Sequence, residues 1–450
     1  MASSSAPSEI VSTETVTSIS EPSNAHTATP EPVAVGGPRI PLILPLRGRD
    51  FRLLFAGESI SMLGDQFHVV ALAWLALQLT GSGLALGTVL MVGAIPRAVL
   101  MLVGGAYSDR LSPRSLMLVS NGVRAVVVGL LAALVLTGNA QLWQLYILAA
   151  IFGVFEAFFW PALSTIVPML TGASHLPAAN ALMQGSQQLT GLVGPAVAGL
   201  LVAAVQTGPA FAIDSVSFVV AAVALLLVTG GRRSRPDAAQ TGAASEGLFA
   251  TIRAGIREAW RDPAIRTIFV LTAAFNLAFT GPISVGIAWA ARDHWGGSAV
   301  FGILLSAFGA GALVGAIGAG SMGRVRQLGW ATLAVAALLG VGLAAIGLAP
   351  NAVIAFIVLL AMGLGVGFIN VRSVAWLQAR VPDAMRGRII GLVSFGSVSL
   401  APISLAVSGA VVDVAATAMF AVAGGIVILA CLIGVAWGLP AQMQEVEATH

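Results

Sequence analysis

Long apolar runs follow one another along most of the chain, with only short polar loops between them. Each run has some 20 residues or more, the length that an α-helix needs to cross the hydrocarbon core of a bilayer. Backbone polar groups find no water there, so the spans are expected to be helices. Hydrophobic residues make up 57% of the 450 residues and charged residues only 9%. This composition excludes an ordinary soluble domain and predicts an all-α membrane protein.

The apolar runs form two groups of six on either side of an Arg-rich interval. They cover residues 53–79, 83–107, 115–137, 141–168, 178–205 and 209–229, and then 266–291, 297–322, 328–348, 351–379, 388–412 and 414–438. The predicted parts are a disordered cytoplasmic tail (1–45), an N-terminal six-helix bundle (46–230), a linker with a surface helix (231–265), a C-terminal six-helix bundle (266–440) and a second tail (441–450). The sequence thus predicts 12 transmembrane helices in two six-helix halves.

All 22 basic residues are arginine, and they are unevenly distributed between the loops. Loops on the side of the N-terminal tail hold nearly all of the loop arginines, and the opposite side holds Arg292 alone. Because short cytoplasmic loops carry the positive excess, both termini and the linker are predicted to be cytoplasmic in a cell membrane.

Several activities are excluded by what the sequence lacks. Without lysine there is no P-loop or Schiff-base chemistry, and no nucleophile triad or cluster of metal ligands stands out. We expect a monomer in the lipid bilayer that is not an enzyme and uses no cofactor, metal or nucleic acid.

The loop between the second and third spans carries a dense motif, which runs from Gly105 through Asp109 and Arg110 to Arg114. A glycine lets a neighbouring helix approach closely. A carboxylate just past a helix end can interact with the positive N-terminus of another helix. Asp109 is therefore a candidate conformational switch, and the alternative is that these charges only anchor a tight turn.

The fifth span contains Gly194, Pro195 and Gly199. Proline removes a backbone donor from the helix, and the glycines, with Gly191, offer a smooth surface for close helix packing. A mechanical role in gating is one interpretation. The other is that proline and glycine are simply common in membrane helices.

These motifs resemble those of the major facilitator superfamily over about residues 45–440. The loop from Gly105 to Arg114 is similar to the superfamily's signature loop, and Gly194 to Gly199 resembles the signature of its proton-driven exporters. Segments 153–162, 211–218, 259–263 and 386–388 resemble the branch of macrolide-efflux proteins and siderophore exporters. The resemblance implies alternating access by two helical halves, and contact of Asp109 with the eleventh helix in one conformation only.

Ionisable side chains inside the N-terminal spans carry the functional signal, because each is costly in the bilayer unless paired or hydrated. They are Glu58, Asp65, His68, Arg97, Arg124 and Glu156. At a rise of about 1.5 Å per residue, all except Asp65 and His68 lie roughly 8–14 Å from the cytoplasmic boundary. The two acids and two arginines at that depth are predicted to neutralise one another.

Asp65 would then be the acid left without an arginine, roughly 20 Å into the membrane. We predict it as the proton-carrying group, with Glu156 second, and His68 one turn further could share its proton. The alternatives are structural: Asp65 as a local hydrogen-bond acceptor, His68 as a satisfied polar residue, and Glu58 and Glu156 as ion-pair partners. Asp214 is predicted in the first turn of the sixth span, where an acid suits the helix dipole.

The C-terminal spans hold few charges, and Asp413 is assigned to an external loop. Candidate residues for the lining of a substrate cavity are Phe275, Asn276, Phe279, Trp289, Phe368 and Asn370. A weakly polar cavity suits a large hydrophobic or amphipathic molecule better than a sugar or phosphate.

The preferred function is export of drugs such as macrolides, or of siderophores, by proton antiport. An importer or facilitator on the same fold is the main alternative, and a receptor or lipid-handling enzyme is the third.

Overall fold

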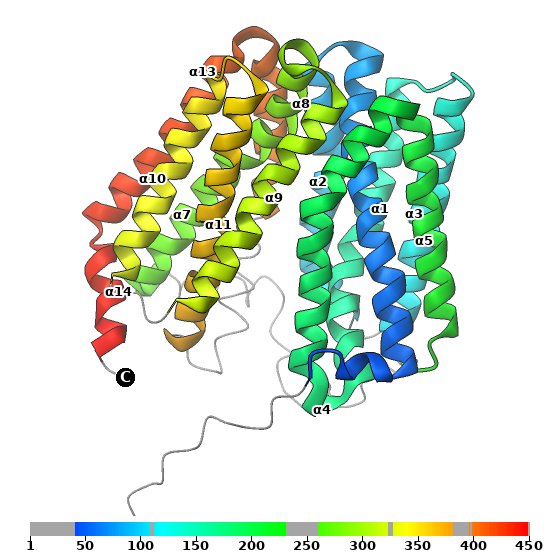
Figure 1. Cartoon of the computed structure of the whole chain (residues 1–450), viewed down its shortest axis with the longest axis horizontal. Helices are drawn as coiled ribbons and strands as arrows, with labels where there is room; N and C mark the ends of the chain where they lie inside the picture. Colours follow the sequence, from blue (N-terminus) through cyan, green and yellow to red (C-terminus); the bar gives the residue numbers. More distant parts are fainter. Residues whose placement is uncertain are drawn as a thin grey trace, which may run out of the picture. The chain divides into compact units, whose positions relative to one another are not determined.

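A computed structural model of the protein describes residues 41–108, 112–230, 260–322, 327–380, 396 and 398–448. All regular structure in these ranges is helical (Figure 1). The first half contains η1 (Leu44–Arg47), α1 (Arg49–Thr80), α2 (Gly83–Ser108), α3 (Pro113–Leu136), α4 (Leu142–Val205) and α5 (Thr207–Leu227). The second contains α7 (Pro263–Gly281), η4 (Pro282–Gly286), α8 (Ile287–Ala290), η5 (Ala291–Trp295), α9 (Ser298–Ser321), α10 (Leu328–Gly347), α11 (Ala352–Arg380), α13 (Ala401–Ala436) and α14 (Leu439–Ala448).

Ten helices in the described ranges are long and apolar enough to cross a membrane. α4 has 64 residues, which at about 1.5 Å per residue is roughly three times the thickness of the bilayer core. It is broken at Gly172, whose φ of 68° and ψ of 161° are not helical, and α13 is broken likewise at Ala415. α4 therefore contains two spans, and α13 contains the end of one span, whose start lies outside the described residues, and the whole of the next. This arrangement fits the predicted all-α fold of twelve crossings.

Some of the predicted boundaries lie outside the described residues. These include the tail up to residue 40, most of the linker with its surface helix, and the start of the predicted span 388–412. Within the described residues, the structure differs from the prediction at the loop expected between residues 168 and 178. Helical backbone continues through it except at Gly172, because a single glycine with positive φ is enough to turn the chain.

The two halves meet where α2 packs on α13 and α4 packs on α9. At the first crossing, a β-carbon on Gly87 would lie 2.7 Å from the Cα of Gly409. At the second, a β-carbon on Gly302 would overlap the carbonyl oxygen of Pro195 and lie 2.9 Å from the Cα of Gly199. Both crossings thus depend on glycine, because a side chain at either would force the backbones apart.

The predicted packing surface on the fifth span is confirmed at the α4–α9 crossing. Pro195 and Gly199 both contact Gly302, while Gly194 faces Gln66 on α1. The backbone N–H of Ala196 donates to Ser306 Oγ of α9 over 2.9 Å, which joins the two halves directly. The role of these residues in gating stays a prediction.

Replacing Gly302 with valine is expected to disfavour this conformation by about 1–3 kcal/mol, the usual cost of overpacking a tight contact. The transport rate should fall in proportion to the population of this conformation. The check is a transport assay combined with thermal unfolding of the purified protein. Gly318→Val is the matched control, because Gly318 lies on the same helix with open space around it. Equal behaviour of the two variants would contradict the prediction.

Candidate functional site

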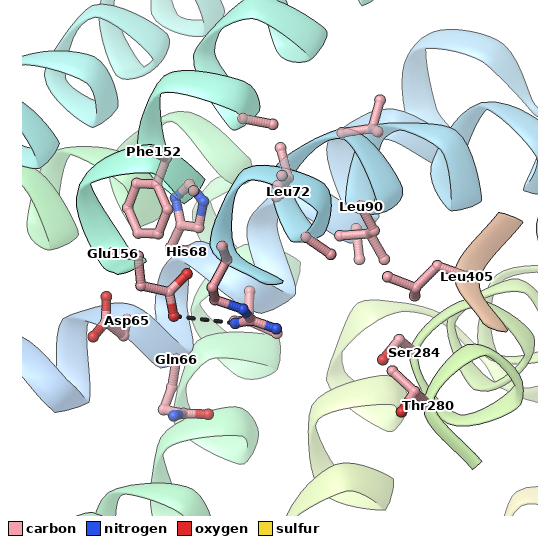
Figure 2. Close-up of a pocket in the computed structure, with 18 of the residues that line it drawn as sticks. Asp65, Gln66, His68, Leu72, Leu90, Phe152, Glu156, Thr280, Ser284 and Leu405 are labelled. Atoms are coloured by element: carbon pink, nitrogen blue, oxygen red, sulfur yellow. Dashed lines mark hydrogen bonds and ion pairs between the residues drawn. The ribbon is translucent and has the colours of Figure 1, made fainter. Parts of the chain in front are cut away.

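A cavity of about 340 Å³ lies between residues of both halves (Figure 2). α1, α2 and α4 form most of its wall, and Thr280 of α7, Ser284 of η4, Phe301 and Leu305 of α9 and Leu405 of α13 close it from the second half. Most of the wall is apolar. Its polar lining residues are Asp65, Gln66, His68, Arg97, Glu156, Gln187, Thr190, Thr280 and Ser284.

Arg97 and Glu156 form an ion pair in the cavity wall. Arg97 Nη1 lies 3.1 Å from Glu156 Oε1, and their side chains are 38% and 21% exposed. This ion pair is one part of the neutralisation predicted among Glu58, Arg97, Arg124 and Glu156; the sequence did not predict which acid would pair with which arginine. Because both groups remain partly exposed in the cavity, each can also contact a bound molecule.

Arg124 occupies the interior of the first half, with only 1% of its surface exposed. Its guanidinium lies over the rings of Phe218, Phe159 and Phe152 at 4.3, 4.5 and 5.7 Å from the ring centroids. Nη1 lies 3.7 Å from Asp65 Oδ1. Attraction to aromatic faces and to a carboxylate together compensate for the buried charge.

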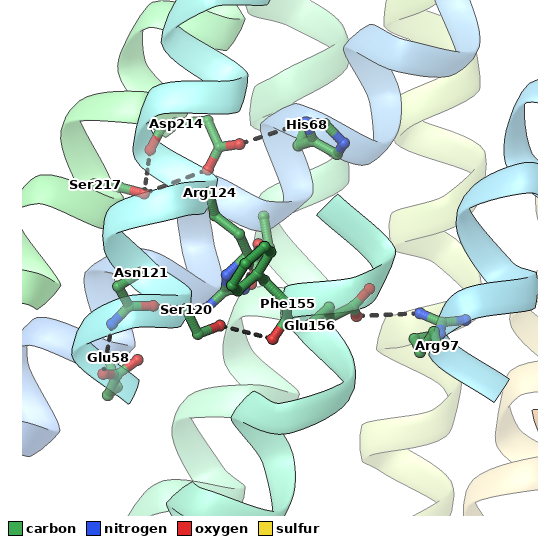
Figure 3. Close-up of polar contacts among 11 residues, drawn as sticks. Glu58, His68, Arg97, Ser120, Asn121, Arg124, Phe155, Glu156, Asp214 and Ser217 are labelled. Atoms are coloured by element: carbon green, nitrogen blue, oxygen red, sulfur yellow. Dashed lines mark hydrogen bonds and ion pairs between the residues drawn. The ribbon is translucent and has the colours of Figure 1, made fainter. Parts of the chain in front are cut away.

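The prediction that Asp65 lacks an arginine is therefore wrong. The rise along a helix gives the depth of a residue but not the direction of its side chain, and a long arginine side chain spans several ångströms of depth. Glu58 reaches Arg124 only through Asn121, which donates to Glu58 Oε1 over 3.2 Å and accepts from Arg124 Nη2 over 2.6 Å (Figure 3). A lone asparagine in the third apolar run was the sequence signal for this bridge.

His68 and Asp214 form a second buried pair. His68 Nδ1 lies 3.6 Å from Asp214 Oδ2 (Figure 3). The predicted position of Asp214 in the first turn is wrong, because the helix begins at Thr207 and Asp214 lies two turns in, fully buried. His68 Nδ1 thus faces a carboxyl group of α5, and the expected sharing of a proton between His68 and Asp65 stays a prediction.

All buried ionisable acid, arginine and histidine side chains of the described residues belong to the first half. They are Glu58, His68, Arg124 and Asp214. Within that half they come from α1, α3 and α5. Buried polar side chains of the second half are serine and threonine in the ranges that the structure covers. The two halves are therefore chemically unequal around a shared cavity.

The predicted switch loop is only partly visible. Asp109 and Arg110 lie outside the described residues, as does the start of the eleventh span near Gly387, and Gly105 lies near the end of α2. Arg114 donates from Nε to the carbonyl of Leu225 over 2.8 Å and from Nη2 to that of Leu226 over 2.9 Å. These bonds satisfy carbonyls at the carboxyl end of α5, where a cation is favourable. The switch role stays a prediction.

None of the six predicted cavity residues of the second half lines this cavity. The rings of Phe275 and Phe279 stack with centroids 4.7 Å apart, and the ring of Phe308 lies tilted against Phe279 at 5.1 Å. Asn276 donates to the carbonyl of Thr272 in its own helix, and Trp289 packs beside His294. Phe368 and Asn370 lie on α11, which contributes nothing to the cavity wall. Thr280 and Ser284 take their place, and no sequence pattern distinguishes these two from other small polar residues in membrane helices.

Asp413 links the halves at the beginning of α2. Its Oδ1 accepts from the backbone N–H of Gly83 over 2.8 Å, and its Oδ2 accepts from Ser82 Oγ and the N–H of Leu84 over 2.9 and 3.3 Å. It belongs to α13, just before the break at Ala415, and not to a loop as predicted. A carboxylate from the second half thus caps a helix of the first.

Replacing Asp413 with asparagine is expected to loosen this contact. Charge-assisted hydrogen bonds contribute about 1.5 kcal/mol or more, so the population of this conformation should fall about tenfold relative to others. Spin labels at Leu84 and Val414, in a Cys431→Ser background, report the separation by electron paramagnetic resonance. A second, longer distance should appear in the variant. Asp293→Asn is the control, because Asp293 pairs with its neighbour Arg292. An unchanged distance distribution in Asp413→Asn would show that the contact of Asp413 with the start of α2 does not stabilise this conformation.

Two sets of apolar helices that cross the bilayer and share one partly polar cavity define a multi-pass membrane transporter of small molecules. Residues 54–404 match the model of the Major Facilitator Superfamily, and the chain belongs to this superfamily. Its members are transporters and not enzymes, as the sequence predicted.

Similar proteins support the same assignment. The chain is 26% identical to the multidrug efflux pump Tap of Mycolicibacterium fortuitum, over 82% of this chain and 90% of that protein. It is 25% identical to macrolide efflux protein A of Streptococcus pyogenes, over 81% and 89%. A bacterial homologue of the iron transporter ferroportin, solved in its inward-facing state, shares the fold with a TM-score of 0.68 at 16% identity, over 86% of this chain and 98% of that one.

Proposed function

We propose that the protein is a secondary transporter that exports hydrophobic or amphipathic small molecules in exchange for protons. Drugs such as macrolides are the first candidate substrates, because relatives that match over most of their length are drug and macrolide efflux proteins. Siderophores are the second, on the sequence motifs alone. The distribution of arginine between the loops supports a cytoplasmic position for both termini.

The observation that carries this proposal is the cavity itself. It combines an apolar wall with two carboxyl groups, those of Asp65 and Glu156, and with the single arginine Arg97. Apolar surface suits a large amphipathic molecule, and carboxyl groups in a membrane cavity are typical positions for proton exchange. Asp65 is 29% exposed although it also lies beside Arg124. It is therefore placed to exchange between an ion pair and a protonated form.

Alternating access would involve the two glycine crossings, Asp413 on one side of the membrane and Asp109 on the other. The Asp413 contact closes the end of the molecule where α1 ends and α2 begins. Under the proposed orientation that end is external. Asp109 and Arg110 would act at the cytoplasmic end when the cycle reverses, which requires the two contacts to alternate.

The experiment uses the purified full-length protein in proteoliposomes with a labelled macrolide outside. An acidic lumen should drive substrate inward, because protons leave as substrate enters. Uptake driven by an acidic exterior would indicate symport and thus an importer. Uptake that ignores the pH gradient would indicate a facilitator, and either result would overturn the proposal. A labelled siderophore in the same vesicles separates the two substrate candidates.

A further inference from the structure

The segment from Phe211 to Phe218 on α5 presents one face to the other helices of the first half. Phe211 meets the ring of His68 edge-on at 5.8 Å, and Phe218 lies beside the ring of Phe152 at 6.0 Å. Asp214 lies between them on the same face, since residues three, four and seven apart share one side of a helix. The carboxyl group of Asp214 therefore lies on a helix face between two aromatic rings. It takes no part in the ion pairs Arg97–Glu156 and Arg124–Asp65.

Asp214 is sealed from the cavity. It is 0% exposed, and its Oδ2 has no hydrogen-bond partner. Gly64 of α1 packs against it so tightly that a β-carbon there would overlap Ser217 Oγ and lie 2.7 Å from Asp214 Oδ1. A buried carboxyl oxygen without a hydrogen bond is costly, and Oδ1 accepts only a long hydrogen bond from Ser217 Oγ, over 3.4 Å. The arrangement therefore leaves Oδ2 available to accept a proton.

His68 is the link between Asp214 and the cavity. Its side chain lines the cavity, and its ring stacks flat on Phe152 with centroids 4.3 Å apart (Figure 2). Its Nδ1 faces Asp214 Oδ2 at 3.6 Å and has no hydrogen bond in this conformation. The gap is only slightly longer than a hydrogen bond, so a small rotation of the ring closes it.

We infer that His68 passes protons between the cavity and Asp214, and that Asp214 is the buried carboxyl group that stores the coupling proton. A proton that arrives at Nε2 gives an imidazolium. The Nδ1 proton then moves to Asp214 Oδ2, which leaves a neutral imidazole and a neutral carboxylic acid. The reverse sequence returns the proton to the cavity. This inference rests on the proposed proton antiport and adds a site to it.

The surrounding charges fit such a relay. Asp65 on α1, Arg124 on α3 and Glu156 on α4 are the charged groups that act electrostatically on His68 or Asp214. Glu156 is already paired with Arg97, and Arg124 lies beside Asp65. Among these acids Asp214 alone has no arginine in a described ion pair. Within the described residues its ion-pair partner is His68.

The test compares Asp214→Asn and His68→Gln with wild type in the proteoliposomes. Gradient-driven uptake should fall by at least about tenfold in both variants, as expected when a proton-transfer group is removed. In Asp214→Asn, whose side chain is not part of the cavity wall, exchange of labelled for unlabelled substrate without a gradient should continue and should lose its dependence on pH. Ser215→Ala is the control, because Ser215 lies beside Asp214 in sequence but donates to the carbonyl of Ala125.

The possible failures can be told apart. A wild-type protein that ignores the gradient would refute proton antiport as a whole. A responsive wild type together with an Asp214→Asn variant that keeps the wild-type gradient response and pH profile would overturn the relay alone. Loss of exchange in both His68→Gln and Asp214→Asn would show that the pair is structural, and would also overturn it.

Discussion

Replacing Arg124 with methionine is expected to destabilise the protein by about 3–5 kcal/mol, the range measured when one partner of a buried ion pair is removed. Methionine keeps much of the apolar stem but leaves Asp65 without its cation and Asn121 without a donor. The three phenylalanine rings around the guanidinium also lose a favourable contact. Unfolding in denaturant, followed by tryptophan fluorescence in detergent micelles, measures the change.

Arg97→Met provides the comparison, because Arg97 is also in an ion pair but is 38% exposed. Its replacement should cost no more than about 1 kcal/mol, as is usual for solvent-accessible pairs. Adding Asp65→Asn to Arg124→Met should recover part of the loss, since the orphaned carboxylate is then removed. Similar stabilities of the Arg124 and Arg97 variants would show that burial of the guanidinium contributes little.

Replacing Asp65 with asparagine is expected to abolish proton-driven transport while substrate exchange survives. The amide has the shape of the carboxyl group but cannot take up a proton, so the cavity loses the partly exposed acid that we propose to alternate between Arg124 and a proton. The decrease should be about 10²-fold or more, as for other proton-transfer groups. Initial rates of labelled macrolide uptake with and without a pH gradient measure both activities.

Gln66→Ala is the matched variant, since Gln66 follows Asp65 on α1 and also lines the cavity but does not titrate. It should alter substrate affinity without changing the response to the gradient. If Asp65→Asn still responded to the gradient as wild type does, Asp65 would have to be assigned a purely structural role beside Arg124.

The number and nature of the crossings could be predicted from the sequence because bilayer thickness fixes the length of a span. No comparable constraint fixes how each helix is rotated about its axis. Depth alone predicts neutralisation among Glu58, Arg97, Arg124 and Glu156, and the structure shows which partners meet in one case, Arg97 with Glu156. Asp65 was mistaken for an unpaired acid because depth says nothing about the path of the Arg124 side chain.

The contacts between distant spans were the least predictable. Asp413 was assigned to a loop, whereas it caps the start of α2, some 330 residues earlier in the chain. Asp214 was predicted in the first turn of its helix, where a carboxylate interacts well with the helix dipole. α5 begins at Thr207, so Asp214 lies two turns inside it. The cavity residues of the second half were chosen for aromatic character, but Thr280 and Ser284 line the wall instead. Each error concerns tertiary packing, which local patterns do not encode.

The confinement of buried charge to the first half has a consequence for how such a carrier diversifies. Under the proposed proton antiport, the buried ionisable groups that would couple transport to the gradient all belong to the first half. Thr280, Ser284 and Leu405 of the second half line the same cavity without a titratable group, so substitutions there could change substrate preference and leave the coupling groups unaltered. Such a carrier could then acquire a new substrate through substitutions in the second half, while every intermediate variant keeps the buried ionisable groups of the first half.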